Sequence, residues 1–511
     1  MEPQASLLPA RAALDRARRS RDARFDGRFF IGVTSTGVYC RPVCPAPSPR
    51  AAHVRYFPSA AAAADAGFRP CLRCRPEAAP GTPAWLGTSA VVRRALALIQ
   101  DGALDSESVD SLAARLGIGP RHLHRLFVAH VGAPPLAVAQ TRRLHFAKRL
   151  IDDSELSMTE IALASGFGSL RRFNAAFLET YERPPSALRR LRRAGAAGQS
   201  GELVLRLALR PPYDLGHLLG FLAERALPGV ERVDEAGYAR TAASEAGPLV
   251  VRVGTASATT PAGRRAAPPA LELRIDGAPA AALFRLTADA RRMFDLAADP
   301  AVIEAALARD PLLGPLVRRR PGLRIPGAWD PFECAVRAIL GQQVSVAAGR
   351  TLAVRLVERA GTRLATPRHG LTHLFPAAAA LAGADLSGLG LTSGRRAALQ
   401  ALARAVADGR LDLRADAEQV VAGLRALPGV GDWTAQYVAL RALGEPDAFP
   451  AADLVLRRMA GRDGRPLTAR ALAARAAAWR PWRGYAVFHL WAGARGRGQV
   501  LHSRTRARLE S

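Results

Sequence analysis

The sequence predicts a multidomain α+β chain with four parts in order. A small α/β domain with four cysteines comes first, then an all-α domain with two helix-turn-helix units, then a sheet-bearing α+β subdomain, then a second all-α body. The cysteines cluster early, two glycine turns repeat one helical pattern, and apolar alternation through about residue 285 gives way to helical periodicity. A chain of 511 residues is long enough for about three or four such domains.

The composition points to a polyanionic partner. The formal net charge is +28, from 72 Lys and Arg against 44 Asp and Glu, which suggests a polyanion, although genomic G+C content could also contribute to the arginine excess. Double-stranded DNA is the polyanion that the motifs below indicate. No run of about 18 apolar residues predicts a membrane span, and the N-terminus has no apolar signal-peptide core. Five cysteines are too few for a secreted disulfide framework. We therefore expect a cytoplasmic, nucleoid-associated monomer without membrane contact.

Residues 1–80 hold two close pairs of cysteines, Cys40 with Cys44 and Cys71 with Cys74. Two such pairs joined by a loop can close a tetrahedral four-thiolate zinc site. The spacing also allows a purely structural zinc knuckle that does no chemistry. A redox Cys-x-x-Cys motif is a weaker alternative, because it leaves the other pair unexplained. One zinc ion is expected, and no NAD.

The sequence motifs around these cysteines are specific enough to indicate a family. Asp26-Gly-Arg-Phe-Phe30, Thr36-Gly-Val-Tyr-Cys40-Arg-Pro-Val-Cys44 and Gly67-Phe-Arg-Pro-Cys71-Leu-Arg-Cys74 closely resemble the N-terminal domain of the Ada alkylation-response protein over about residues 22–78. The resemblance implies that Cys40 is both a zinc ligand and the irreversible acceptor of a methyl group from a methylphosphotriester in DNA. Pro45-Ala46-Pro47 departs from that family, which usually carries basic residues there.

Residues 85–193 carry a repeated helix, glycine turn and helix, with turns at Gly117 and Gly166. Four arginines of the second helices are expected to face outward and bind DNA: Arg121, Arg125, Arg171 and Arg172. The tandem units resemble the AraC-type domain that follows the methyl-acceptor domain in Ada. This implies sequence-specific transcription activation with RNA polymerase as a partner. A helical packing module without base contacts is the alternative.

A linker is predicted at 194–201, because Arg192-Arg-Ala-Gly-Ala-Ala-Gly-Gln-Ser-Gly201 is small and polar. Strands are expected at 202–209, 249–253 and 271–275 within a subdomain that spans 202–318, and a helix is expected after Asp214. The later chain is expected to be helical, with a body over 319–495 and a basic tail over 496–511. Cys334 lies in an apolar helical run and is expected to be buried.

The predicted body contains Leu427-Pro-Gly429-Val-Gly431-Asp-Trp433-Thr434, which predicts a tight turn that needs both glycines, followed by a helix over Thr434–Leu443. Backbone N–H groups at such a turn can hold a DNA phosphate, with Gly429, Gly431 and Thr434 as the contact residues. Asp453 begins the next apolar run. The alternative is an ordinary turn between core helices, with Asp453 serving only as a helix N-cap.

The C-terminal half resembles 3-methyladenine DNA glycosylase II, of the helix-hairpin-helix superfamily, over nearly all of 202–494. The matching words are Pro211-Pro-Tyr-Asp214, the run Asp330 to Val346, the hairpin, and Trp479 to Trp491. The resemblance implies excision of alkylated purines, with Asp453 catalytic, and Trp433, Tyr437 and Trp491 lining the base pocket. It also places Gln342 and Gln343 on DNA, with Gln343 where the family inserts an apolar wedge.

Position 433 also predicts the reaction type. Bifunctional members of the superfamily carry a lysine nucleophile there, whereas this chain carries Trp433. A monofunctional glycosylase without strand cleavage is therefore expected. The C-terminal half has no cluster of four cysteines, so no iron–sulfur cluster is expected. Two alternatives remain: a regulator whose C-terminal half only binds DNA, and a glycosylase for a neutral lesion or mismatch.

Overall fold

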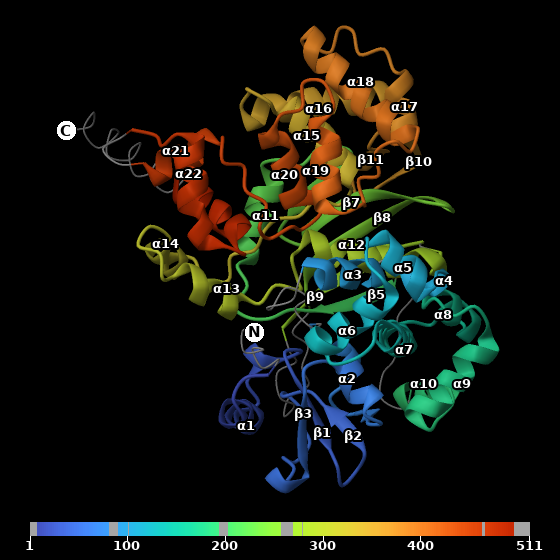
Figure 1. The fold of residues 1–511 in the computed structure, drawn as a ribbon. Helices are drawn as coiled ribbons and strands as arrows, with labels where there is room; N and C mark the ends of the chain where they lie inside the picture. The colour runs from blue at the N-terminus through green and yellow to red at the C-terminus, as the bar shows by residue number, and fades with distance from the viewer. Residues whose placement is uncertain are drawn as a thin grey trace. The chain divides into compact units, whose positions relative to one another are not determined.

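The computed structural model describes residues 8–80, 90–100, 102–193, 203–256, 269–277, 279–461 and 465–494. The predicted linker 194–201 and tail 496–511 lie outside these ranges. The chain forms two compact units (Figure 1), one of residues 1–211 with 244–291 and one of residues 212–243 with 292–511. Among the described residues, no helix combines the length and the apolar character needed to cross a bilayer.

The first unit begins with the four-cysteine domain. Its sheet has the order β3-β1-β2-β4, and only the β2–β4 pair is parallel. Phe29, Ile31 and Val54 are buried with Cys40, Cys71 and Cys74 in one small core cluster. The elements are α1 (Arg11–Ser20), η1 (Ala23–Phe25), β1 (Phe30–Val33), β2 (Val38–Cys40), η2 (Ala51–His53), β3 (Val54–Phe57), α2 (Ala60–Asp65), β4 (Arg69–Pro70) and η3 (Pro76–Ala78).

The paired helix-turn-helix prediction is confirmed. Gly117 and Gly166 adopt left-handed backbone, with φ of +68° and +79°, which glycine tolerates without steric cost. The two units use α5 with α6 and α8 with α9. The helices are α3 (Ala90–Gln100), α4 (Ala103–Ser106), α5 (Val109–Arg115), α6 (Pro120–Val131), α7 (Pro135–Asp153), α8 (Met158–Ala164), α9 (Leu170–Tyr181) and α10 (Pro185–Arg193).

The four-cysteine domain packs on the helical domain, chiefly through α7. The Tyr39 hydroxyl lies 2.8 Å from His145 Nε2 on α7. The buried Ser59 hydroxyl donates a 2.8 Å hydrogen bond to the Val131 carbonyl at the end of α6, and Arg75 lies 2.9 Å from the Asp152 carboxylate. The two domains therefore belong to one compact unit, although separate sequence patterns predict them.

The predicted strands are present in the first unit as β5 (Leu203–Ala208), β8 (Gly247–Thr255) and β9 (Ala270–Asp276). Antiparallel β9 pairs with both of the others, with Leu205 opposite Leu273 and Val251 opposite Ile275. These apolar residues are buried, as their alternation predicts. Short helices η4 (Ala280–Ala282) and α12 (Leu283–Met293) follow.

A second hairpin of β6 (Glu231–Asp234) and β7 (Gly237–Ser244) was not predicted. The burial of β7 is nearly continuous from Gly237 to Ala242 and includes Arg240, which is 3% exposed. The Arg240 guanidinium lies 2.7 Å from the Glu333 carboxylate, so a buried ion pair neutralises it. Sequence alternation could not predict a strand with this pattern.

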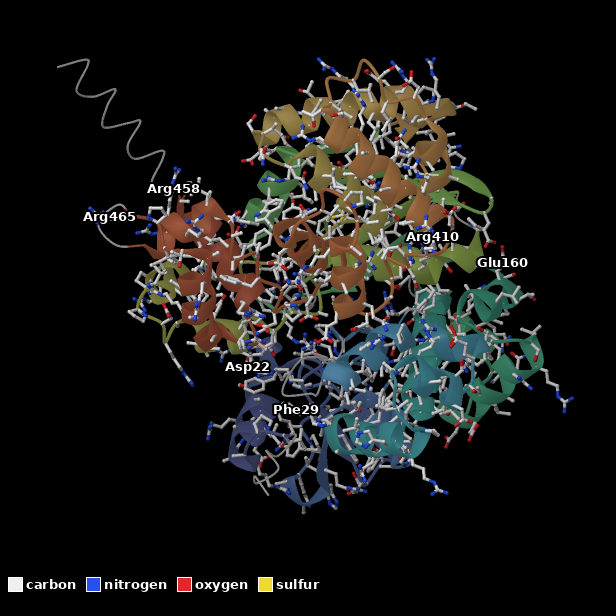
Figure 2. The ribbon with its side chains drawn as sticks, turned by 45° about the horizontal axis from the view of Figure 1, so that its top comes forward. Asp22, Phe29, Glu160, Arg410, Arg458 and Arg465 are labelled. Atoms are coloured by element: carbon white, nitrogen blue, oxygen red, sulfur yellow. The ribbon has the colours of Figure 1, made fainter. Side chains whose placement is uncertain are left out.

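The second unit is mainly helical (Figure 1). Helix α15 is buried on nearly every face, and Cys334 within it is 4% exposed, as predicted. Arg410, Arg458 and Arg465 extend from the surface of this unit (Figure 2). The helices are α11 (Leu215–Ala223), α13 (Pro300–Leu307), α14 (Leu313–Arg319), α15 (Pro331–Leu340), α16 (Val346–Ala360), α17 (Ala378–Gly383), α18 (Ser393–Ala407), α19 (Ala417–Arg425), α20 (Asp432–Ala442), α21 (Leu454–Ala460), α22 (Ala469–Ala476), η5 (Ala477–Trp479) and residues 483–494.

The expectation that the later chain is wholly helical is wrong at one place. Strands β10 (Thr362–Arg368) and β11 (Leu371–Leu374) form a hairpin whose outer strand is largely exposed. His369 and Gly370 at the turn both have positive φ, 54° and 76°, as two-residue hairpin turns require. The His-Gly pair was therefore the available signal, because an exposed strand shows no apolar alternation.

Candidate functional site

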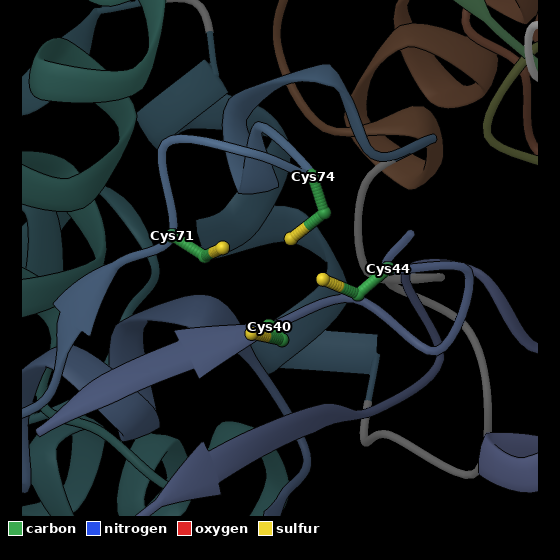
Figure 3. A group of neighbouring side chains, drawn as sticks. All are labelled: Cys40, Cys44, Cys71 and Cys74. Atoms are coloured by element: carbon green, nitrogen blue, oxygen red, sulfur yellow. The ribbon is translucent and has the colours of Figure 1, made fainter. Parts of the chain in front are cut away.

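The four cysteines converge in the first unit (Figure 3). Cys40 ends β2 and Cys71 directly follows β4, and the parallel pairing of these strands brings the two cysteine pairs together. Their Sγ atoms all lie within 4.8 Å of one another. Four thiolates around a zinc ion at about 2.3 Å stand about 3.8 Å apart. The donor set and its spacing therefore fit one zinc ion.

Asp26 and Arg41 support this cluster. The Arg41 backbone N–H donates to Cys74 Sγ at 3.4 Å, and its guanidinium donates to the Cys74 carbonyl at 3.0 Å. The same guanidinium forms a buried ion pair with the Asp26 carboxylate, whose Oδ1 accepts from Arg41 Nε at 2.8 Å. Such outer contacts orient metal ligands. Both residues belong to the sequence motifs quoted above, but their pairing was not predicted.

A cavity of about 590 Å³ opens beside the cysteines, lined by Cys40, Cys44 and Cys71. Cys74 is absent from this lining, and its sulfur already accepts the Arg41 N–H. An incoming group in the cavity can therefore approach Cys40 but has no comparable access to Cys74. This geometry leaves Cys40, Cys44 and Cys71 as candidate nucleophiles, and of these the resemblance to Ada points to Cys40.

The four predicted DNA-binding arginines of the helix-turn-helix units are all exposed. Arg121 and Arg125 lie on α6, while Arg171 and Arg172 lie at the start of α9. The opposite faces are buried through Leu123, Phe127 and Val131 on α6 and through Phe173, Phe177 and Tyr181 on α9. The two helices therefore present their cationic side chains away from the core, as predicted.

In the second unit, the glycine turn leads into α20. Gly429 has a φ of +74°, and a Cβ there would stand 3.3 Å from Ala398 Cβ. Gly431 has a φ of −88° and open space around its Cα. The prediction that both positions need glycine is wrong for Gly431, because its backbone is ordinary extended structure. Helix α20 also starts earlier than predicted, at Asp432.

Gln342 contacts the turn, whereas Gln343 points to solvent. The Gln342 side-chain amide donates to the Gly429 carbonyl and to the Thr434 hydroxyl, both at 3.0 Å. Thr434 is 3% exposed, so its side chain faces inward. Gln343 is exposed with a φ of +54°, a strained conformation for a residue other than glycine, and the nearby Val344 and Val346 are exposed apolar residues.

Asp453 receives hydrogen bonds from two indoles. Trp433 Nε1 donates to its Oδ2 at 3.0 Å, and Trp491 Nε1 donates to its Oδ1 at 3.3 Å. Asp453 is also the N-cap of α21, since its side chain accepts from the Leu456 N–H at 2.9 Å. Asp453 is therefore a helix N-cap, as the alternative states, but an N-cap role does not explain the hydrogen bonds from the two indoles.

The three predicted aromatic residues form one wall. The rings of Trp433 and Tyr437 are stacked, with centroids 5.2 Å apart and an interplanar angle of 12°. The ring centroid of Trp491 lies 6.4 Å from that of Tyr437. With Asp453 they line a cavity of about 610 Å³. The structure therefore brings all four residues to one site, although they come from α20, the N-terminus of α21 and helix 483–494.

Two further residues complete the wall, and the sequence did not reveal them. Arg441, 7% exposed on α20, donates from Nη1 to the Tyr437 hydroxyl at 2.6 Å. Its guanidinium lies 4.7 Å from the ring centroid of Phe221, which comes from α11. The Pro-Pro-Tyr-Asp word marks the start of α11, and Asp214 is its N-cap, so this word was the only signal near Phe221.

Charged side chains, several of them buried, also line this cavity. Arg337 lies 2.7 Å from the Glu231 carboxylate and 2.8 Å from the Glu333 carboxylate. Burial raises the pKa of Glu231, but the Arg337 and Arg240 guanidiniums outweigh this effect and bring that pKa to about 2. The acidic and basic side chains of this part of the lining are thus paired with one another.

Family models match four successive segments of the chain. They are the metal binding domain of Ada at residues 13–77, a helix-turn-helix domain at 112–191, the AlkA N-terminal domain at 204–330, and the HhH-GPD superfamily of base excision DNA repair proteins at 336–484. The order of these matches is the order of the sites described above.

The relatives differ in how much of the chain they cover. A protein of Mycobacterium tuberculosis (strain H37Rv), named "Probable bifunctional transcriptional activator/DNA repair enzyme AlkA", is 45% identical over 482 residues, which are 93% of this chain and 95% of that protein. The DNA-3-methyladenine glycosylase 2 of Escherichia coli is 38% identical over 55% of this chain and 94% of its own length.

Among solved structures, the 3-methyladenine DNA glycosylase from Archaeoglobus fulgidus covers 57% of this chain and 98% of its own, at 21% identity and a TM-score of 0.49. The Mycobacterium relative is thus similar to this chain along nearly its whole length. The chain therefore belongs to the family of bifunctional AlkA proteins that join an Ada-type metal-binding domain and a helix-turn-helix domain to a glycosylase of the HhH-GPD superfamily.

Proposed function

We propose that this protein repairs alkylated DNA with two chemistries and regulates transcription in response. One half accepts methyl groups on Cys40 and activates promoters. The other excises alkylated purines such as 3-methyladenine. The observation that carries the excision proposal is the Asp453 carboxylate, held by the Trp433 and Trp491 indoles at the edge of an aromatic cavity.

Excision needs a cation-binding pocket and an anion beside the sugar. An N-alkylated purine is positively charged, and it must leave the duplex stack to enter the cavity. The stacked Trp433 and Tyr437 rings offer electron-rich faces to that cation. As the glycosidic C–N bond breaks, its electron pair stays on the base, and positive charge develops on the sugar. The Asp453 carboxylate stabilises that charge or orients the attacking water.

Strand cleavage is not part of this proposal. A lyase reaction needs an amine nucleophile at the sugar, and position 433 carries an indole. The Trp433 N–H instead orients the carboxylate. We therefore expect a monofunctional enzyme whose products are the free base and an intact strand with an abasic site.

Duplex binding near the cavity uses the glycine turn and the residues before α16. We assign Gly429, Gly431 and the start of α20 to a DNA phosphate, because turn and helix-start N–H groups favour an anion. Gln342 and Thr434 hold the turn from within, so their contribution is to position it. Gln343, exposed and strained between α15 and α16, is the candidate wedge into the base stack.

Methyl transfer uses Cys40. A bound zinc ion would keep the four sulfurs as thiolates at neutral pH. Cys40 Sγ attacks the methyl carbon of a methylphosphotriester, an S–C bond forms, and the C–O electron pair leaves with the phosphodiester. The resulting thioether has lost a negative charge. DNA affinity then rises, because one repulsive charge near the phosphates is gone.

The regulatory step uses the exposed arginines of α6 and α9. The second helix of each such unit enters the major groove in helix-turn-helix proteins. This supports a DNA-binding role for the exposed arginines Arg121, Arg125, Arg171 and Arg172. We propose that the methylated protein binds promoter DNA as a monomer and recruits RNA polymerase, in the cytoplasm at the nucleoid.

The test uses duplex DNA that carries radiolabelled methyl groups. Protein-bound label and label in free bases are separated after incubation. Label in both fractions supports the proposal, and Cys40→Ser should remove only the first fraction. Label found only on protein would mean that the second half only binds DNA or acts on another substrate. Label only in free bases makes the cysteine cluster a structural zinc site.

Asp453→Asn tests the excision step, because Asn caps a helix as well as Asp does but carries no charge. Excision should fall by orders of magnitude, while affinity for duplex DNA stays nearly unchanged. An unaltered excision rate in Asp453→Asn would show that the Asp453 carboxylate does not take part in the chemistry.

A further inference from the structure

The cavity beside Cys40 is not built by the four-cysteine domain alone. Its lining includes Tyr181, Glu182 and Arg183, which end α9 and begin the turn after it. Arg69 on β4 and Glu182 form an ion pair with an N···O distance of 2.7 Å. The second helix-turn-helix unit therefore borders the space in which Cys40 would meet its substrate.

The arginines that line this cavity differ in what they bind. Arg41 is paired with Asp26, and Arg69 is paired with Glu182. Arg18 is 6% exposed and bonded to Tyr56 and Ser48.

The other two lining arginines, Arg73 and Arg183, are exposed. Within the described part of the chain, neither guanidinium has a hydrogen-bond or ion-pair partner. These two side chains are thus available for an external anion.

We propose that Arg183 is a phosphate-binding residue of the methyl-acceptor site, so that the second helix-turn-helix unit supplies a substrate contact to Cys40. This inference rests on the proposed methyl-acceptor function. The methylphosphotriester itself is neutral, but the neighbouring phosphodiesters each carry a negative charge. The loop residues Ala46 and Pro47 line the same cavity without any charge, so cations must come from elsewhere.

Arg183 also suits the electron flow of the reaction. When the S–C bond forms, the C–O electron pair stays on oxygen, and the neutral triester becomes an anionic diester. A guanidinium beside that oxygen stabilises charge that is absent from the substrate, which lowers the barrier more than it tightens binding. Arg73, next to the ligand Cys74, is the second cation of this pair.

Glu182 should act in the opposite direction. Its carboxylate lies at the same cavity and neutralises Arg69. Glu182→Gln removes an anion that repels the phosphate backbone and leaves Arg69 without its ion-pair partner. We expect this variant to accept methyl groups faster than the wild-type protein, whereas Arg183→Ala accepts them more slowly.

The experiment measures single-turnover methyl transfer from a labelled methylphosphotriester duplex to the full-length zinc-loaded protein. Arg183→Ala should react about 3- to 10-fold more slowly at low salt, and Arg183→Lys should recover most of the rate. Loss of one phosphate contact also predicts a smaller salt effect, so the wild-type rate should fall about 3-fold more than the variant rate between 50 and 200 mM salt. Arg16→Ala, which removes an exposed arginine of α1 outside the cavity, is the matched control.

A second substrate distinguishes the loss of a phosphate contact from general disruption of the Cys40 site. Methyl iodide alkylates a thiolate without phosphate, giving the same thioether and iodide, and mass spectrometry locates the product on Cys40. Arg183→Ala should react with methyl iodide at the wild-type rate. Slowing with both substrates, or with neither, overturns the phosphate-binding role. A wild-type protein that takes no label from DNA overturns the methyl-acceptor function itself.

Discussion

At the scale of single residues, Asp453 shows how one carboxylate serves the fold and the site. One oxygen caps α21 and accepts the Trp491 N–H, and the other accepts the Trp433 N–H. These three donors fix the orientation of the carboxylate before any substrate arrives. Preorganised charge of this kind is worth more than charge that must be oriented during the reaction.

Trp433→Phe separates the two contributions of this indole. Phenylalanine keeps a ring against Tyr437 but removes the N–H that donates to Asp453 Oδ2. We expect single-turnover excision of 3-methyladenine to slow by about tenfold, the value of roughly one hydrogen bond to a partly exposed charge. Base affinity should change less than the rate, because the stacking surface remains.

Trp479→Phe is the matched control. It removes a similar indole bond, to Asp310 Oδ2 at 2.7 Å, from a residue that does not line the cavity. This variant should lower stability and leave excision at its normal rate. Equal rates for Trp433→Phe and the wild-type protein would show that the indole bond does not orient the catalytic carboxylate.

At the scale of elements, periodic patterns and local sequence motifs predicted the structure well. Features that depend on contacts between distant residues could not be predicted. The four cysteines, the two helix-turn-helix turns and the strands β5, β8 and β9 follow from spacing within short segments. Strand β7 could not be predicted from its sequence, because it is buried continuously, contains the charged Arg240 and shows no apolar alternation. The partner of Arg240, Glu333, is distant in sequence, so no local pattern could mark the pair.

The candidate site shows the same limit. Asp453, Trp433, Tyr437 and Trp491 were predicted because each stands in or near a recognisable word. Phe221 and Arg441 were not, since their roles depend on how α11 meets α20. The position of Glu182 and Arg183 beside Cys40 depends likewise on packing between two domains.

The glycine turn before α20 offers a paired test. Gly429→Ala places a Cβ on a left-handed backbone close to Ala398, which should cost about 1–2 kcal/mol and lower the melting temperature by about 2–8 °C. Gly431→Ala should leave the melting temperature unchanged, because its φ of −88° suits alanine and the space is open.

Affinity for duplex DNA should nevertheless fall in Gly431→Ala, since the added methyl group stands where a phosphate would approach the backbone N–H groups. Thermal unfolding and binding to an undamaged duplex measure the two effects separately. A Gly431→Ala protein with normal stability and normal affinity would contradict the assignment of this turn to a phosphate.

At the scale of the whole molecule, the first compact unit includes residues beyond the four-cysteine and helix-turn-helix domains. Residues 203–211 and 244–291 belong with the N-terminal unit. Phe284 packs edge-on against Phe146 of α7 with ring centroids 4.9 Å apart, and the buried Arg210 donates from Nε to the Asp26 carbonyl at 3.0 Å. Segments of the AlkA-type N-terminal domain thus complete the unit that holds the cysteine cluster.

Arg210 is joined to the metal-binding cysteines through a short series of contacts. Asp26 accepts from Arg210 with its carbonyl and pairs with Arg41 through its carboxylate, and Arg41 bonds both the sulfur and the carbonyl of Cys74. Contacts outside the ligands commonly change metal affinity by about 10- to 100-fold when they are removed. Arg210, which follows β5, is therefore expected to affect a metal site that lies far away in sequence.

Arg210→Ala in the full-length protein should release zinc to a chelator about tenfold faster than the wild-type protein does. Arg206→Ala is the control, because Arg206 is exposed on β5, shortly before Arg210, and forms no hydrogen bond with Asp26. Zinc release is followed with a colorimetric chelator, and circular dichroism checks that the fold is kept. If both variants release zinc at the wild-type rate, the contacts through Asp26 do not affect the metal site, and the four-cysteine domain holds its ion without help from Arg210.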